Sequence, residues 1–341
     1  MERALSREGL AALTLFAQQP QGATLHGTVV AAETGAPLAF SIVALRPGLN
    51  EHFTDQTGTF TFAGIATGTY RLLVRQIGYA PAETTLVVGR DADVTVRIAL
   101  FRVGVELPPI TVTGELTCVQ PGPPDTAVTP ALAAAFDQLL ENARRFRLLA
   151  DSFPFGFALE RTSYGSSADV RPPGGVEVDT ITQTSAEERR RYRPGAVVEA
   201  GTGSWRGRRV VRLPGLEQFA DSTFVHNHCF RLAGRDSLEG EMFVRVDFEP
   251  AARLRTSDVS GAAYLDLSSF QLRYTQVRLT RPERALRGVL ALVVTTRFRE
   301  IVPGIVLHDR VRAVTSLPRQ TQRIEEQRLL AVTFTRPFFV H

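Results

Sequence analysis

Two histidines and a cysteine lie close together in the sequence, at His226, His228 and Cys229. On an extended strand His226 and His228 would share a face, so both imidazoles could reach one metal ion. Such a site needs a further ligand, for which His308 is the candidate elsewhere in the chain. Two imidazoles alone form an incomplete site. The prediction is therefore that no metal is bound and that the two histidines lie on a solvated strand.

The chain has two cysteines, Cys118 and Cys229, which could form a disulfide. Paired cysteines are the usual state in an oxidising compartment. The bridge would close a long loop and connect the middle of the chain to its C-terminal part, a constraint worth ~3–5 kcal/mol in the chain-entropy model. We predict the disulfide; the alternative is two separate buried thiols.

Carboxylates in the second half of the chain are candidates for acid–base chemistry, because a pair of them could divide the roles of acid and base. They are Asp247, Glu249, Asp258 and Asp266. Acidic residues at alternate strand positions are more often surface residues. The sequence also lacks the motifs GxSxG and HExxH. We therefore predict no catalytic residues.

A glycine-rich stretch, GTGSWRG, contains Gly201, Gly203 and Gly207 and loosely resembles a phosphate-binding loop. Its spacing differs from that of a Walker loop, and no helical pattern follows it. The stretch is better explained as a hairpin in which Trp205 is a packing residue. No cofactor-binding residue is predicted.

The composition is that of a folded protein with two domains: 341 residues, 44% hydrophobic and 22% charged. The formal net charge is +4, and all 39 basic residues are arginine. Nucleic-acid binding would require these arginines to cluster on one face. They are spread along the chain, so nucleic acid is not a predicted partner.

The first residues resemble an export signal. Gly9 to Ala17 is an apolar run of the length of a signal-peptide core, and a small residue ends it. Cleavage is expected near Ala17, with residues 1–22 as signal peptide and leader; a frayed helix or a misplaced start is the alternative. No later run reaches the length of a membrane-spanning helix. The predicted location is the periplasm or the outer membrane surface.

The stretch from Thr54 to Tyr79 predicts two short strands separated by glycine turns. Phe60 and Phe62 alternate with threonines, and the following residues alternate in the same way. Asp55 to Gly58 has the composition of a tight turn, because Asp can accept backbone hydrogen bonds and Gly adopts positive φ. Similar strands before and after this stretch predict a sandwich of about seven strands.

The pattern TDxxGxFxFxGIxxGxYxLxVRxIGY in this stretch resembles the carboxypeptidase regulatory-like domain, a small transthyretin-like β-sandwich. The resemblance covers about residues 24–101. It implies a scaffold or docking module and no catalytic residue. We assign this domain to residues 23–104.

A linker and a helix follow. Residues 105–128 are rich in proline and predict a stiff, extended linker. Thr129 and Pro130 are suited to the N-cap and first turn of a helix, which Pro154 would prevent from continuing. Glu141 and Arg145 are expected to pair on its exposed side. The buried stripe is predicted to consist of Leu132, Phe136, Leu139, Ala143, Phe146 and Ala150.

The rest of the chain predicts antiparallel strands, so residues 129–341 are assigned to an α+β domain with one helix and a curved sheet. The apolar alternation slips between Tyr274 and Val277, which predicts a bulge there. The segments HCFRLAG and VRVDFEP resemble the C-terminal half of uncharacterised exported proteins. They are also distantly similar to lipoprotein-carrier half-barrels.

Three functions remain open. The first is a non-catalytic binding or scaffold protein of the cell envelope, with an envelope protein as partner and with membrane association. The second is a carrier that holds a lipid or other apolar ligand between the Leu290–Phe298 and Met242–Phe248 faces. The third is a metal-dependent hydrolase at His226 and His228. An open apolar cavity would favour the carrier, and a filled core would favour the scaffold.

Overall fold

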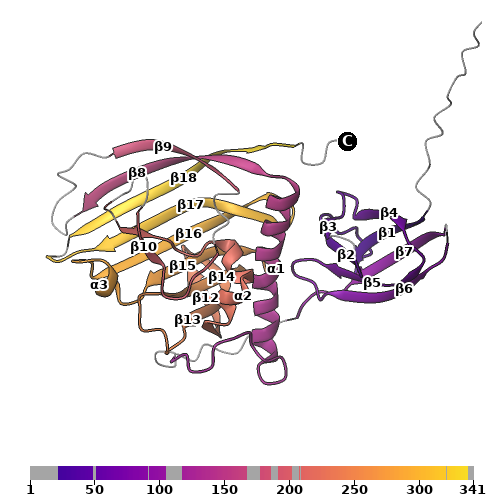
Figure 1. Ribbon diagram of the computed structural model, residues 1–341, viewed down its shortest axis with the longest axis horizontal. Coiled ribbons are helices and arrows are strands. Elements are labelled where there is room, and N and C mark those ends of the chain that lie inside the picture. Colours follow the sequence, from indigo (N-terminus) through magenta and orange to yellow (C-terminus); the bar gives the residue numbers. More distant parts are fainter. Residues whose placement is uncertain are drawn as a thin grey trace, which may run out of the picture.

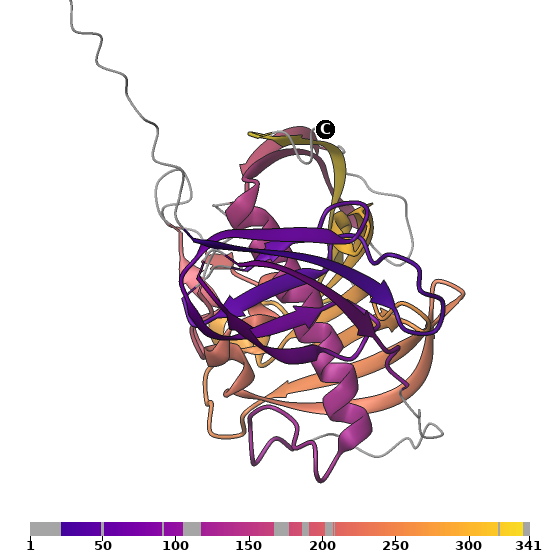
Figure 2. The same ribbon diagram turned by 90° about the vertical axis from the view of Figure 1, so that its right-hand side faces the viewer.

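The computed structural model describes residues 22–48, 51–90, 92–104, 117–166, 177–185, 191–201, 207, 209–319 and 321–336. Within them the chain is mainly β, as predicted. A long helix, α1 (Pro130–Ser152), stands between a small β-sandwich and a large curved sheet (Figures 1 and 2). The predicted export signal lies outside the described residues. Among the described residues, no helix combines the length and the apolar character needed to cross a membrane.

The N-terminal sandwich consists of two small sheets packed face to face. One has the strand order β4-β1-β7 and the other β3-β2-β5-β6. Leu25, Leu45 and Leu72, each fully buried, contribute to the apolar core between them. The strands are β1 (Ala23–Ala31), β2 (Ile42–Arg46), β3 (His52–Phe53), β4 (Thr59–Ile65), β5 (Gly68–Arg75), β6 (Ala82–Val88) and β7 (Asp93–Leu100).

The turn before β4 forms as its composition predicts. Oδ1 of Asp55 accepts hydrogen bonds from the backbone N–H groups of Thr57 and Thr59, both at 2.8 Å. Gly58 has a φ of +73°, and a Cβ at this position would lie 2.8 Å from the carbonyl oxygen of Val29. Glycine is therefore required both for the backbone conformation and for the close approach of β1.

The large curved sheet of the C-terminal part is a half-barrel of nine antiparallel strands with the order β12-β13-β14-β15-β16-β17-β18-β8-β9. Neighbouring strands are consecutive in sequence except that β18, the last strand, pairs with β8, the first. The strands are β8 (Phe155–Ser166), β9 (Glu177–Thr184), β12 (His228–Leu238), β13 (Glu241–Pro250), β14 (Val259–Asp266), β15 (Leu272–Leu279), β16 (Ala291–Val302), β17 (Ile305–Ser316) and β18 (Gln322–Phe334).

Short elements join these strands. β10 (Val198–Ala200) and β11 (Arg209–Val211) form an antiparallel pair, and the 3-10 helix η2 (Leu216–Ala220) and helix α2 (Ser222–Val225) follow them. Helix α3 (Pro282–Ala285) lies between β15 and β16. α2 and α3 are single turns that the sequence did not predict.

Bulges change which face of the half-barrel a side chain occupies, and two of them bear on the predictions and the cavity. Tyr264 pairs with Tyr274 and Leu265 with Leu272, which leaves Arg273 as the extra residue. The predicted bulge between Tyr274 and Val277 was therefore misplaced. A second bulge, at Asp309 in β17, follows from the pairing of Arg297 with Arg310 and of Phe298 with His308.

Helix α1 buries two faces. Its apolar stripe, which includes Phe136, Leu139 and Phe146, packs into the half-barrel. Glu141 and Arg145 pair as predicted, at 3.9 Å, but the expectation that they do so on an exposed side was wrong, because their side chains are 6% and 0% exposed. They lie against the sandwich, which covers what would otherwise be the solvent side of α1 (Figure 2).

Polar contacts join the sandwich to α1. Arg145 donates to the carbonyl oxygens of Phe40 in the sandwich and Gly304 in the half-barrel. Oε1 of Gln138 accepts from the N–H of Gly78 at 2.7 Å. The sandwich residues Phe40, Ile42, Phe53 and Ile77 also belong to the same apolar cluster as α1 and the half-barrel. The core is therefore continuous across the helix.

Candidate functional site

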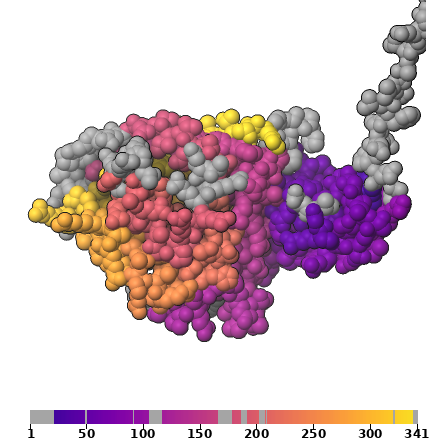
Figure 3. Space-filling model, in the orientation of Figure 1, coloured from indigo at the N-terminus to yellow at the C-terminus, as the bar shows by residue number. Residues whose placement is uncertain are grey.

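A cavity of about 1130 Å³ lies between the inner face of the half-barrel and a covering segment, of which residues 191–201 and 209–218 are described. The segment includes β10, β11 and the start of η2. Figure 3 shows rose and coral atoms of this part of the chain over the front of the half-barrel. Small-molecule sites usually have volumes of roughly 300–1,000 Å³, so this cavity is large enough for a long or bulky ligand.

The part of the cavity floor that β16 and β17 form is mainly apolar. β16 contributes alternate residues, Leu292, Val294 and Phe298 among them, and Val311 of β17 lies beside them. The face of β16 that was predicted to bind an apolar ligand therefore does line the cavity. Leu290 does not: it lies before β16 and is 63% exposed.

The prediction that the Met242–Phe248 face forms the other wall of the cavity was wrong. Phe248 packs edge-on against Phe219 and Phe224, with ring centroids 5.6 and 5.7 Å apart. Met242 is exposed at the end of the strand. This part of the half-barrel is filled by η2 and α2, so it forms core and not cavity.

The mouth of the cavity is cationic. Arg191, Arg193, Arg209 and Arg323 line the cavity and are exposed, so they mark where it meets solvent. Arg212 also lines it, and its Nε lies 3.9 Å from an oxygen of Glu199. The lining thus changes from apolar along β16 and β17 to charged at β18 and at the surface.

His308 reaches the cavity because of the β17 bulge. The extra residue, Asp309, shifts the alternation of the strand and places His308 opposite Phe298, on the inner face. Its ring lies 4.9 Å from that of Phe157. Burial lowers the pKa of His308 to about 4, against the opposing charge of Asp309, so the imidazole is neutral near pH 7.

A buried polar cluster anchors the covering segment. Oδ2 of Asp258 accepts hydrogen bonds from the Tyr192 hydroxyl and the Gly195 N–H, both at 2.7 Å. Its Oδ1 accepts from the N–H of Val259 at 2.8 Å. Burial, reinforced by the carboxylate, raises the pKa of Tyr192, which stays protonated and acts as a donor.

His228 belongs to this cluster and not to a metal site. Its ring is fully buried and stacks on Phe224, with centroids 4.0 Å apart. Nδ1 lies 2.9 Å from the carbonyl oxygen of Phe224, and Nε2 lies 3.1 Å from that of Val259. Burial lowers the pKa of His228, while the two carbonyl groups and the Asp258 carboxylate act in the opposite sense.

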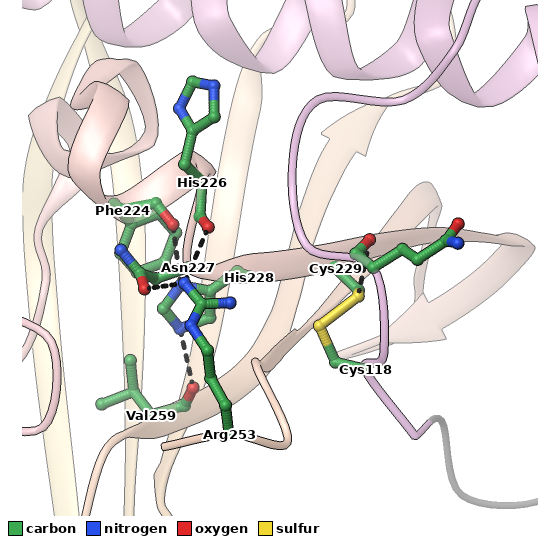
Figure 4. Close-up of a disulfide and its surroundings, with 9 residues drawn as sticks. Cys118, Phe224, His226, Asn227, His228, Cys229, Arg253 and Val259 are labelled. Carbon is green, nitrogen blue, oxygen red and sulfur yellow. Dashed lines mark hydrogen bonds between the residues drawn. A yellow bond between two sulfur atoms is a disulfide. The ribbon is translucent and has the colours of Figure 1, made fainter.

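His226 and His228 do not share a strand face, contrary to the sequence interpretation. His226 is the exposed residue that ends α2, and its Nδ1 contacts the carbonyl oxygen of Ser222 at 2.8 Å. Figure 4 shows its ring pointing away from that of His228. Within the described part of the chain, no three His, Cys, Asp or Glu residues are grouped as metal ligands would be.

Cys118 and Cys229 form a disulfide with a Cα–Cα distance of 5.4 Å (Figure 4). The bridge joins the segment before α1 to β12. Two backbone hydrogen bonds support it, from Gly122 to the carbonyl oxygen of His228 and from Ala252 to that of Cys118. The predicted linker, 105–128, lies partly outside the described residues, and its described half is fastened to the half-barrel.

The remaining candidates have structural roles. Asp247 is paired with Arg231 and Arg245, both at 2.6 Å. Asp266 accepts bonds from the N–H groups and hydroxyls of Ser268 and Ser269 in the β14–β15 turn, which lower its pKa to about 2 although burial acts in the opposite direction. Glu249 lies near the end of β13, opposite Cys229 of the edge strand β12.

The glycine-rich stretch lies between β10 and β11, which pair as the two strands of a hairpin, so Gly201 and Gly207 flank its loop. Gly203 and Trp205 lie outside the described residues.

Sequence reasoning missed the arginines of the cavity mouth. One signal in the sequence was the motif RYR at residues 191–193, in which an aromatic residue separates two arginines. This alternation predicts one buried and two exposed side chains, as observed. That Tyr192 would meet Asp258, which is 66 residues away in sequence, could not be inferred from local pattern.

Comparisons with known proteins give a clear match only for the N-terminal part. No curated protein matches the chain. Among solved structures, a chain of a type II cohesin–X–dockerin complex from Acetivibrio cellulolyticus is 24% identical over 24% of this chain, with a TM-score of 0.21. This chain spans 58% of that chain's length.

Two other solved structures overlap more of the chain. A LolA superfamily protein from Nitrosomonas europaea is 12% identical, with coverage of 58% of this chain and 92% of the other and a TM-score of 0.31. A DUF1329 family protein from Desulfovibrio piger is 11% identical, with coverage of 61% and 95% and a TM-score of 0.36. Likeness at these scores carries no conclusion about function.

The family model for the carboxypeptidase regulatory-like domain matches residues 24–101. This range includes nearly all of the seven strands of the sandwich, and it agrees with the range expected from the sequence pattern. Residues 24–101 of this chain are a carboxypeptidase regulatory-like domain.

Proposed function

We propose that the protein is a binding protein that carries an apolar or amphiphilic ligand in the half-barrel cavity. The observation that carries this proposal is the cavity itself, about 1130 Å³ with a floor of aliphatic and aromatic side chains. A chain whose half-barrel served only as a scaffold would fill this space with its own side chains, as the β13 side of the sheet does.

The driving force would be burial of the ligand's apolar surface against β16 and β17. Each methylene group that leaves water contributes about 0.8 kcal/mol. The neutral state of His308 near pH 7 suits this role, because a charged group on the floor would oppose the entry of an alkyl chain.

The cell envelope is the proposed site of action. The apolar run from Gly9 to Ala17 predicts export, and the Cys118–Cys229 disulfide is typical of an oxidising compartment. In this arrangement the carboxypeptidase regulatory-like domain would be the docking module, fixed to the half-barrel through α1.

The test is native mass spectrometry of the full chain purified from its own host, followed by titration with the neutral apolar fluorophore phenylnaphthylamine. The expected results are added mass in the lipid range and saturable fluorescence. Val294→Trp, which places an indole ring on the apolar floor of the cavity, should weaken binding. The matched control, Val293→Trp, places the same side chain on the opposite face of β16 and should bind normally.

A protein that binds no fluorophore and carries no added mass would overturn the proposal. A bound polypeptide in place of a lipid would support the scaffold function and direct attention to the sandwich.

A further inference from the structure

The two ends of the cavity differ in the polarity of their lining. The apolar floor comes from β16 and β17, whereas four exposed arginines lie at the mouth: Arg191, Arg193, Arg209 and Arg323. Three of them belong to the covering segment, and Arg323 faces it from β18. A ligand that fills the cavity would therefore have its outer end among guanidinium groups.

The carboxylates that share the lining offset the arginines only in part, because the described lining contains five arginines and three glutamates, an excess of two positive charges. Glu199 lies beside Arg212 at 3.9 Å. Oε1 of Glu217 accepts a hydrogen bond from Gln218, and Oε1 of Glu325 accepts one from Gln327. None of the four mouth arginines has an ion pair with a residue that the structure describes.

Several arginines elsewhere on the half-barrel are paired with carboxylates, whereas the four at the mouth are not paired with any described residue. Arg231 and Arg245 share Asp247, and Arg312 contacts Glu326 at 3.1 Å. Similar pairs occur at Arg161–Asp179, Arg299–Asp309 and Arg328–Glu160. Among the described residues the mouth thus carries an excess of positive charge, and this charge attracts anions.

The covering segment holds two of the arginines in place. Tyr192 lies between Arg191 and Arg193, and its hydroxyl donates to Asp258 at 2.7 Å while the adjacent arginines remain exposed. The same carboxylate binds the N–H of Gly195. Because these contacts fix the backbone next to Arg191 and on both sides of Arg193, less freedom is lost when the guanidinium groups bind a ligand.

We propose that the ligand is an anionic amphiphile: an alkyl chain in the cavity and a phosphate or carboxylate group among the mouth arginines. Guanidinium groups suit this role, because they form strong, often bidentate hydrogen bonds to both kinds of oxyanion. This inference rests on the proposed function, since it requires that the cavity binds an alkyl chain.

The test is displacement of phenylnaphthylamine from the full chain by lauryl phosphate, laurate and neutral monolaurin, which carry alkyl chains of comparable length. The two anions should bind at least about tenfold more tightly than monolaurin, the difference expected from one charge-assisted hydrogen bond. High salt should reduce this difference. The ratio between lauryl phosphate and laurate will show which head group is preferred.

Variants separate the head group from the chain. The double variant Arg191→Gln/Arg193→Gln and the single variant Arg323→Gln should weaken binding of both anions and leave monolaurin unchanged. Arg310→Gln is the matched control, because Arg310 is exposed on β17 and does not line the cavity. Equal affinity for the anions and monolaurin would overturn the anionic head group while leaving the carrier function. Failure of all three to displace the fluorophore would overturn both.

Discussion

Nε of Arg75, at the end of strand β5, lies 3.1 Å from Oε2 of Glu141 on helix α1. Both side chains are buried, at 12% and 6% exposure, and Glu51 and Arg145 extend the contact at either end. Burial raises the pKa of Glu141, and the two guanidinium groups oppose this shift. The interface between the sandwich and α1 thus contains charges that stabilise it only while all of them are present.

Glu141→Gln tests this dependence. The variant leaves Arg75 and Arg145 buried without their shared carboxylate, so the free energy of unfolding should fall by about 3 kcal/mol or more. Guanidinium chloride denaturation at constant pH measures the change. The control is Glu83→Gln, which removes an exposed partner of Arg71 and should cost less than about 1 kcal/mol. Equal losses in the two variants would contradict a structural role for the buried pair.

The sequence predicted local structure well where the cause is local. The Asp55 turn and the alternation around Phe60 are determined by residues a few positions apart, and they match the structure. On α1, the polar residues Gln138, Glu141, Asn142 and Arg145 also recur at helical spacing. Such a stripe usually faces water. Nothing within the helix indicates that a second folded unit covers it, so its burial could not be predicted.

The cavity could be predicted only in part for the same reason. The alternation of side chains in β16 correctly predicted the strand's inner face, which includes Val294. The orientation of His308 depends on a bulge whose position is determined by pairing with β16, and the filling of the β13 side depends on where Phe224 packs. These contacts join residues far apart in sequence, and pattern within one strand contains no information about them.

The disulfide should contribute strongly to stability, because Cys118 and Cys229 are separated by 111 positions. A loop of about 100 residues corresponds to roughly 4.7 kcal/mol in the chain-entropy model, and measured values are often smaller. Thermal unfolding with and without reductant should show a lower midpoint for the reduced chain. The double variant Cys118→Ser/Cys229→Ser should match the reduced chain and be insensitive to reductant. A wild-type midpoint unaffected by complete reduction would refute this.

His308 should make stability depend on pH. Its pKa is about 4 in the folded chain and near 6.5 when unfolded, so between these values the unfolded chain binds a proton that the folded chain does not. The contribution of the neutral His308 to the free energy of unfolding is therefore complete above about pH 6.5 and decreases as the pH falls toward 4. His308→Gln should therefore lose less stability than the wild type between pH 7 and pH 5, by about 1–2 kcal/mol.

The control for this measurement is His226→Gln, which replaces an exposed histidine that follows α2 and lies outside the cavity. If His308→Gln shows the same pH dependence as His226→Gln, the imidazole of His308 is protonated as readily as it is in the unfolded chain, and the apolar character assigned to the cavity floor is wrong.

Tyr192 connects the stability of the covering segment to the release of ligand. Tyr192→Phe removes the hydrogen bond to Asp258 and keeps the ring, so the expected cost is about 1.5–3 kcal/mol. Because this bond holds the segment over the cavity, the variant should release phenylnaphthylamine several-fold faster, with a smaller effect on its association. Stopped-flow fluorescence measures both rates.

Tyr164→Phe is the matched control, since it removes a hydrogen bond to Glu326 away from the cavity and should leave the release rate unchanged. If Tyr192→Phe loses stability but releases the fluorophore at the wild-type rate, the segment does not control access, and ligand must enter and leave by another route.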